Sequence, residues 1–155
     1  MSYAKSVLQP NEQLVMVGKL HWIIFSHAIL WLLVGIVLVI VENIMMSDEL
    51  RTYAVSITVV VFGIGFLIAF VHAWFIRWIT EFSVTDRRVI YKRGFINRHT
   101  AEMNMDKVES VDVDQSVLGR MLGYGTIHVL GTGQGIEHLH RIAHPIELRN
   151  AIIAK

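Results

Sequence analysis

The sequence has no cysteine among its 155 residues, so disulfide bonds, thiol chemistry and cysteine-ligated metal sites are excluded. Charged side chains are scarce as well: Asp, Glu, Lys and Arg make up 17% of the chain, whereas soluble domains contain about 25%. The deficit is local, because neither Leu20–Val41 nor Thr52–Ile76 contains any of these four residue types. The composition therefore combines a membrane-like part with a water-soluble part.

The two uncharged stretches are long enough to cross a lipid bilayer. A helix of about 22 residues reaches about 33 Å, and the hydrocarbon core of a bilayer is about 30 Å thick. We therefore predict transmembrane helices over 20–41 and 52–79, joined by a short external loop over 42–51. Buried core helices are the alternative, but they do not need uncharged runs of this length. A cleaved signal peptide is not favoured for the first stretch, because no small-residue cleavage site follows it.

Charge asymmetry predicts which way the helices face. The connecting loop is acidic, whereas the N-terminal segment 1–19 and the segment after the second stretch carry lysines and arginines. Positive residues concentrate on the cytoplasmic side of membrane helices. We therefore predict a multi-pass plasma-membrane protein with both termini in the cytoplasm, in which 80–155 form a cytoplasmic domain.

Three histidines lie in the predicted spans, at His21, His27 and His72. An ionisable residue inside a membrane span is a functional candidate by default. No acidic residue accompanies these histidines within the spans, which argues against a proton relay. A hydrogen bond between the helices or a place at the membrane interface is the favoured interpretation.

From residue 81 onward, short alternating runs are separated by turn residues, which is typical of a β-sandwich or small barrel. The expected strands are 81–85, 88–93, 95–105, 107–115, 126–130 and 135–143. In the first, Phe82 and Val84 are expected to point inward, and Ser83 and Thr85 outward. The run 107–115 is expected to contain a bulge or form an edge, because neither alternation register is consistently apolar.

Two short helices are expected as well. Pro145 suits a first helical position, and Leu148 and Ile152 share a face, which predicts a C-terminal helix. In SVLGRMLGYG (116–125), the apolar residues are spaced to share one side of a single helical turn.

Five motifs, taken in order, resemble the bacterial PH-domain membrane proteins, which carry a two-helix hairpin and one PH-like domain. These motifs are PNEQLVMVGKLHW (10–22), TDRRVIYKRG (85–94), VESVDVDQSVLGRMLGYGTIHV (108–129), GTGQG (131–135) and IAHPIELRNAI (142–152). The resemblance covers nearly the whole chain. It implies a membrane α-helical hairpin plus an all-β PH-like bent sandwich of about six or seven strands, capped by a C-terminal helix. Because six strands follow the spans, Val15–Lys19 is a candidate for the seventh.

The resemblance also implies a bacterial inner membrane, but it leaves the activity open, because the family's biochemical activity is poorly defined. Fold is therefore predicted more sharply than function.

GTGQG (131–135) looks like a phosphate-binding loop. Such a loop needs a helix after it, so that the helix N-terminus meets the phosphate. Here IEHLHRI alternates like a strand, and no lysine lies between Lys107 and Lys155. We predict a hairpin loop, with no cofactor and no nucleic-acid partner.

The apolar turn has two interpretations. It is either a plug that closes one end of the sandwich or an exposed tip that docks on the membrane or on a neighbouring subunit. The candidate residues for contact with a partner are Leu118, Arg120, Met121, Leu122 and Tyr124.

A basic set follows the second span: Arg87, Arg88, Lys92, Arg93 and Arg98. These residues are candidates for binding anionic lipid headgroups, since each cation near such a surface adds about 1 kcal/mol. The alternative is that they only set the membrane orientation.

His138 and His140 alternate in an expected strand and share a face, so with His144 or His128 they are weak candidates for a zinc site. No carboxylate is placed with them by spacing, and the favoured interpretation is solvated histidines without a metal.

The expected function is therefore that of a non-enzymatic interaction or scaffold module, which binds membrane lipids and a protein partner or copies of itself. The alternative is a PH-like domain that senses anionic lipids or a small ligand. An enzyme is not favoured, because no spacing pairs a nucleophile with a base, and two spans are too few for a transport pathway in one chain.

Overall fold

The computed structural model describes residues 7–94, 99–132 and 136–154, and the side chains of 136–138 lie outside this description. The chain divides into two compact units. One comprises Met1–Ile23 and Ile76–Lys155, and the other is Ile24–Phe75. Each unit is held together by contacts among its own residues.

The second unit is a hairpin of apolar helices. A 3₁₀ turn, η1 (Trp22–Phe25), leads into α2 (Ser26–Met45), and α3 (Asp48–Ile79) follows it. Both are long and apolar enough to cross a membrane, over Trp22–Met45 and Asp48–Ile79. Glycines let aromatic rings pack between the helices: a Cβ on Gly35 would lie 2.8 Å from Phe62, and one on Gly65 would lie 2.7 Å from the Trp31 ring. Helix extends through most of the segment expected to be a loop, leaving Met46 and Ser47 between α2 and α3.

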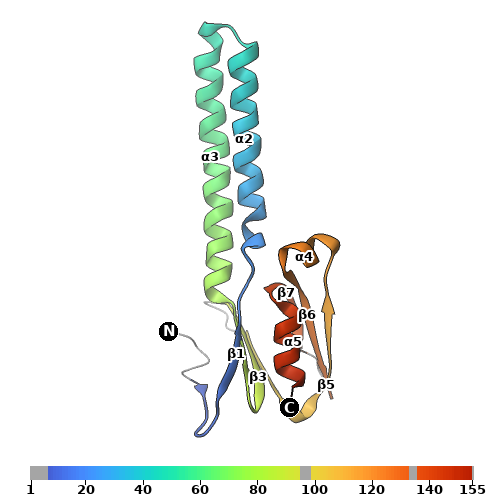
Figure 1. The fold of residues 1–155 in the computed structure, drawn as a ribbon. Coiled ribbons are helices and arrows are strands. Elements are labelled where there is room, and N and C mark those ends of the chain that lie inside the picture. The colour runs from blue at the N-terminus through green and yellow to red at the C-terminus, as the bar shows by residue number, and fades with distance from the viewer. Residues whose placement is uncertain (1–6, 95–98, 133–135, 155) are drawn as a thin grey trace. The chain divides into compact units, whose positions relative to one another are not determined.

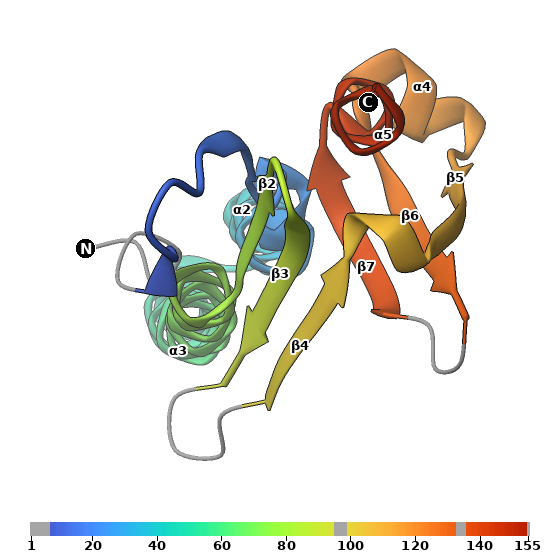
Figure 2. The same ribbon diagram turned by 90° about the horizontal axis from the view of Figure 1, so that it is seen from below.

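The other unit contains seven antiparallel strands in two sheets with a C-terminal helix packed on them (Figure 2). Its elements are β1 (Leu14–Gly18), β2 (Glu81–Thr85), β3 (Arg88–Arg93), β4 (His99–Asn104), η2 (Met105–Lys107), β5 (Val108–Asp114), α4 (Val117–Leu122), β6 (Tyr124–Gly131), β7 (Ile136–Ala143) and α5 (Pro145–Ile153). The sheet orders are β1-β2-β3-β4 and β5-β6-β7. The predicted fold class is confirmed.

The seventh strand comes from the segment before the helices, as expected. β1, blue in Figure 1, pairs antiparallel with β2, and Gly18 lies opposite Phe82. Just beyond β1, the chain also joins the other sheet: Leu20 bridges Ile142, and the Ala143 N–H donates to the Lys19 carbonyl over 2.9 Å. The helical hairpin is therefore inserted between two paired strands of the domain.

The domain core lies between the sheets. It contains Phe82, Val84, Val89 and Tyr91 from the first sheet, Val111, Ile127, Val129, Leu139 and Ile142 from the second, Met103 from β4, and Leu148 and Ile152 from α5. The predicted bulge is present in β5, where the register with β6 shifts between Val108 and Ser110, and β5 is an edge strand. The predicted C-terminal helix begins at Pro145, with Leu148 fully buried.

One detail of β2 was predicted wrongly. Ser83 and Thr85, expected to face solvent, are 1% and 0% exposed. β2 is an inner strand whose second face is covered as well, and Glu12 from the N-terminal segment contributes to that cover through a hydrogen bond with Thr85.

Candidate functional site

The turn between β2 and β3 is organised by Thr85. Its hydroxyl accepts the N–H of Arg88 over 3.0 Å, which closes the turn around the exposed residues Asp86 and Arg87. The Asp86 carboxylate accepts the N–H of Gln13 over 2.9 Å. The tip of the hairpin is thus tied to the segment that precedes β1.

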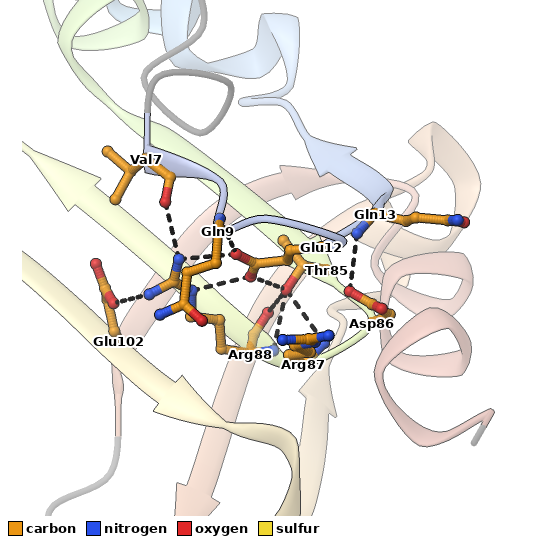
Figure 3. A network of polar contacts seen from close by, with 9 residues as sticks. All are labelled: Val7, Gln9, Glu12, Gln13, Thr85, Asp86, Arg87, Arg88 and Glu102. Carbon is orange, nitrogen blue, oxygen red and sulfur yellow. Dashed lines mark hydrogen bonds and ion pairs between the residues drawn. The ribbon is translucent and has the colours of Figure 1, made fainter.

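Arg88 forms the centre of a buried polar network (Figure 3). Its guanidinium donates two hydrogen bonds to the Glu12 carboxylate, from Nε to Oε1 over 2.9 Å and from Nη2 to Oε2 over 2.8 Å. It also donates to the carboxylate of Glu102 over 2.8 Å and to the carbonyl of Val7 over 2.9 Å. Such a bidentate contact is the strongest geometry for a hydrogen-bonded pair of arginine and carboxylate.

The Glu12 side chain has no exposed surface, and both of its carboxylate oxygens accept hydrogen bonds. The Thr85 hydroxyl donates to Oε1 over 2.8 Å, and the Gln9 N–H donates to Oε2 over 2.7 Å. Burial alone would raise the pKa of Glu12, but the hydrogen bonds from Arg88, Gln9 and Thr85 and the charge of Arg88 outweigh it. They lower the pKa from 4.5 to about 2. The carboxylate is therefore charged and held in place at neutral pH.

Sequence reasoning missed the role of Glu12. It lies 76 residues before Arg88, and no local pattern links the two. The only signal was an acidic residue placed directly before a strand in PNEQLVMVG.

The basic set is dispersed by the structure. Arg88 is engaged with Glu12 and Glu102, whereas Arg87 is exposed at the turn. Lys92 and Arg93 lie at the far end of β3, about 16 Å from Arg87 at about 3.3 Å per residue, and as neighbours in a strand they point to opposite faces. Arg98 lies outside the described residues. The headgroup role of these residues stays a prediction.

The cavity beside the turn has mixed charge. It is lined by Arg87 and Arg88 but also by Asp86 and Asp106. Because anions and cations line it together, it offers no strong preference for an anionic headgroup.

α4 is fixed at both ends. The Ser116 hydroxyl accepts the N–H of Gly119 over 3.0 Å as an N-cap, and Gly123 ends the helix in the left-handed region at φ 76°. Gly119 is the buried residue of the helix, and an added Cβ there would lie 2.7 Å from the Tyr124 carbonyl oxygen. The backbone of this turn therefore packs closely on the start of β6.

The apolar side chains of α4 point outward. Val117, Leu118, Met121 and Leu122 are 76%, 63%, 78% and 42% exposed. We call these four residues the α4 tip. The interpretation of this turn as a plug that closes the sandwich is therefore wrong: only its glycine packs inward. Clustered apolar side chains on a domain surface mark an interaction site more often than scattered ones do.

The other partner candidates lie beside the tip. Arg120 is exposed, and the half-buried Tyr124 stacks its ring on His21, with centroids 5.3 Å apart. His21, predicted within the first span, precedes η1 and is buried in the domain. Its backbone N–H donates to the Arg141 carbonyl over 2.7 Å, and its Nδ1 accepts the N–H of Ile23.

Burial lowers the pKa of His21 below 6.5, and the nearby positive charges add to this, while a hydrogen bond with the backbone of Leu122 opposes it. The ring is therefore neutral at pH 7, and its contacts with Ile23 and Tyr124 lie within the domain. His27 and His72 are exposed on the helices.

The C-terminal histidines whose side chains are described have separate partners. His140 lies 3.3 Å from the Thr126 hydroxyl, His128 lies 3.1 Å from the Asp114 carboxylate, and His144 lies 3.5 Å from Glu147. The side chain of His138 lies outside the description. Within the described part of the chain, no group of three His, Asp or Glu side chains is placed to hold a metal ion.

GTGQG joins two strands. β6 ends at Gly131, β7 begins at Ile136, and the two pair antiparallel. The strand–loop–helix order of a phosphate site is absent from this segment, although residues 133–135 themselves lie outside the described residues.

These features define a class: a PH-like sandwich with a hairpin of two apolar helices inserted in the chain between its first two strands. The family model for the bacterial PH domain matches residues 15–155, and the chain belongs to this family. The family is not known for catalysis, and no enzyme family matches. No curated protein and no solved structure matches the chain.

Proposed function

We propose that the protein is a membrane-anchored, non-enzymatic interaction module. It presents its PH-like domain at the inner face of a bacterial plasma membrane and binds a protein partner or a second copy of itself there. The observation that carries this proposal is the pairing of β1 with β2 on either side of the inserted helical hairpin.

Because of this pairing, the domain is connected to the helical hairpin by two chain segments, one at each end of the hairpin. The chain leaves the domain after Ile23 and returns at Ile76, and Gly18 and Phe82 face each other in the sheet only a few residues away. No flexible linker separates the helices from the strands, since α3 ends at Ile79 and β2 begins at Glu81. The domain is therefore joined to the helical hairpin by two short connections and not by a long linker.

The topology supports an inner-face location. The loop around Ser47 is acidic, whereas the domain side carries most of the lysines and arginines, as expected for a domain in the cytoplasm. Because both β1 and β2 belong to the domain, the segments 1–19 and 80–155 must lie on the same side of the membrane.

The alternative function, sensing of anionic lipids, rests on the exposed Arg87 at the first hairpin turn. It receives less support, because the cavity there also contains Asp86 and Asp106 and Arg88 is committed to Glu12. Reconstituted protein with Arg87→Ala would separate the two: loss of binding to soluble anionic headgroups would favour the alternative.

Photo-crosslinking in intact membranes tests the leading proposal. A photoreactive residue at each of three exposed positions on different strands, Val15, Asp112 and Leu130, is activated before gentle solubilisation. At least one position is expected to give a discrete adduct with a protein or with a second copy. The same position in an Arg88→Met background, where the domain is destabilised, serves as the control. Recovery of the lone monomer from all three positions would count against an interaction module.

A further inference from the structure

We propose that the α4 tip inserts into the lipid surface of the same membrane that the helical hairpin crosses. This inference rests on the proposed function for the membrane topology and names the occupant of one surface of the domain. It does not depend on the angle between the hairpin and the domain, because it uses contacts within the domain alone.

The first support is the place of the tip relative to the chain's exit from the domain. Tyr124, two residues after the tip, stacks on His21, and His21 also hydrogen-bonds the backbone of Leu122. The ring of Trp22 lies 5.3 Å from that of His21. Trp22 is the first residue of the apolar stretch, so the tip is packed within one or two side chains of the point where the chain enters the membrane.

The second support is that other apolar residues share this end of the domain. The N–H of His144 donates to the Gly123 carbonyl over 2.9 Å, which places the start of α5 beside the end of α4 (Figure 2). Ile146, in the first turn of α5, is 51% exposed, and Trp22 is 49% exposed. Exposed apolar side chains therefore also lie on the segments that pack beside the tip.

The third support is the chemistry of the tip. Leucine and methionine side chains enter the boundary between headgroups and acyl chains, and an arginine beside them keeps its charge at the phosphates by extending its stem. Arg120 is exposed between Leu118 and Met121 in this arrangement. His144 and Glu147 at the start of α5 lie 3.5 Å apart, and they line the same hollow as Arg120.

The bilayer is favoured over a protein as the occupant of the α4 tip because, under the proposed function, the domain already lies at the membrane surface. A short apolar helix binds a lipid surface weakly on its own, since its buried area is small. The two chain connections raise the effective concentration of the tip at the membrane, so weak insertion is enough for occupancy. A separate protein partner would gain no such advantage.

Docking of the tip would orient the domain. β6 runs from Tyr124 beside the tip to Leu130, and six residues of strand span about 20 Å. Leu130 therefore lies about 20 Å from the tip along the strand, and under this proposal it is the end of β6 that does not insert.

Because the sequence contains no cysteine, a single introduced cysteine can be labelled specifically, and the depth of its label in the membrane can be measured. Met121→Cys, Leu118→Cys and Leu130→Cys variants of the full chain are labelled with an environment-sensitive fluorophore. They are then reconstituted into vesicles of phosphatidylethanolamine and phosphatidylglycerol, with or without brominated acyl chains. Leu130 is the matched control: it is apolar, 45% exposed and on the strand that starts beside the tip.

Brominated lipid is expected to quench the labels at 118 and 121 at least twofold more than the label at 130. Equal quenching at all three positions would overturn the inference. Protection of position 121 from both brominated lipid and aqueous iodide, with a crosslink from 121 to a protein or a second copy, would also overturn it. That last result would leave the proposed function standing, because the tip would then be a protein interface.

Discussion

Two turns of the PH-like domain have opposite character. The β2–β3 turn, which looked like a ligand site, is a corner of the fold in which Arg88, Glu12 and Thr85 form hydrogen bonds with one another. We call these three residues the corner. The α4 turn, which looked like part of the core, exposes four apolar side chains and buries a glycine. A basic residue with buried partners contributes to the fold, whereas apolar residues that a stable domain leaves outside are available for binding.

The largest predicted effect comes from breaking the corner. Arg88→Met leaves the Glu12 carboxylate buried without its cation, which costs about 3–5 kcal/mol of unfolding free energy. Denaturant unfolding of the full chain in detergent measures the loss. Arg87→Met, one residue away but exposed, is the matched control and is expected to change stability by less than about 0.5 kcal/mol. Equal effects of the two substitutions would remove the distinction between the corner and its exposed neighbour.

Acid should weaken the same corner. The pKa of Glu12 is about 2 in the folded protein and 4.5 when unperturbed, so its stabilisation is complete above pH 4.5 and is lost as the pH falls toward 2. The difference corresponds to about 3 kcal/mol. Unfolding measured from pH 7 to pH 3 is expected to show this decline, and Glu12→Gln should flatten it. A wild-type decline that persists unchanged in Glu12→Gln would assign it to other groups.

The N-cap of α4 contributes a smaller amount. Ser116→Ala removes the acceptor for the N–H of Gly119 and is expected to cost about 1 kcal/mol. Thermal unfolding compared with Ser110→Ala, an exposed serine on β5, checks this. If the two serines behave alike, the shape of the tip does not depend on its cap.

The smallest expected effect on stability is at the tip itself. Leu118→Ser with Met121→Ser should change the unfolding free energy by less than about 0.5 kcal/mol, since neither side chain is buried. Leu148→Ala in the core is the contrasting control, with an expected loss of about 2–5 kcal/mol. A large loss at the tip would mean that it packs against something in the folded protein.

Much of the fold could be predicted from local patterns. Alternation predicted the strands and the bulge at Val108–Ser110, and Pro145 marked the start of α5. The counting of strands pointed to the segment before the helices, where β1 lies at Leu14–Gly18. These features depend on residues that are neighbours in sequence.

The parts that were missed depend on residues far apart in the chain. Nothing near Glu12 indicates Arg88, and Thr85 is buried because a segment more than seventy residues earlier covers it. The direction of the α4 side chains likewise depends on which face of the helix the start of β6 occupies, and that face is the one containing Gly119. Spacing predicted the helix but not its orientation.

The central claim is that the inserted hairpin crosses the membrane and holds the domain at its inner face. Thiol labelling of single-cysteine variants in intact bacterial cells tests it most directly, using Ser47→Cys between the two helices and Thr132→Cys on the domain, both exposed. We predict that a membrane-impermeant reagent labels position 47 in intact cells and position 132 only after the inner membrane is opened. Labelling of position 132 in intact cells would contradict the account.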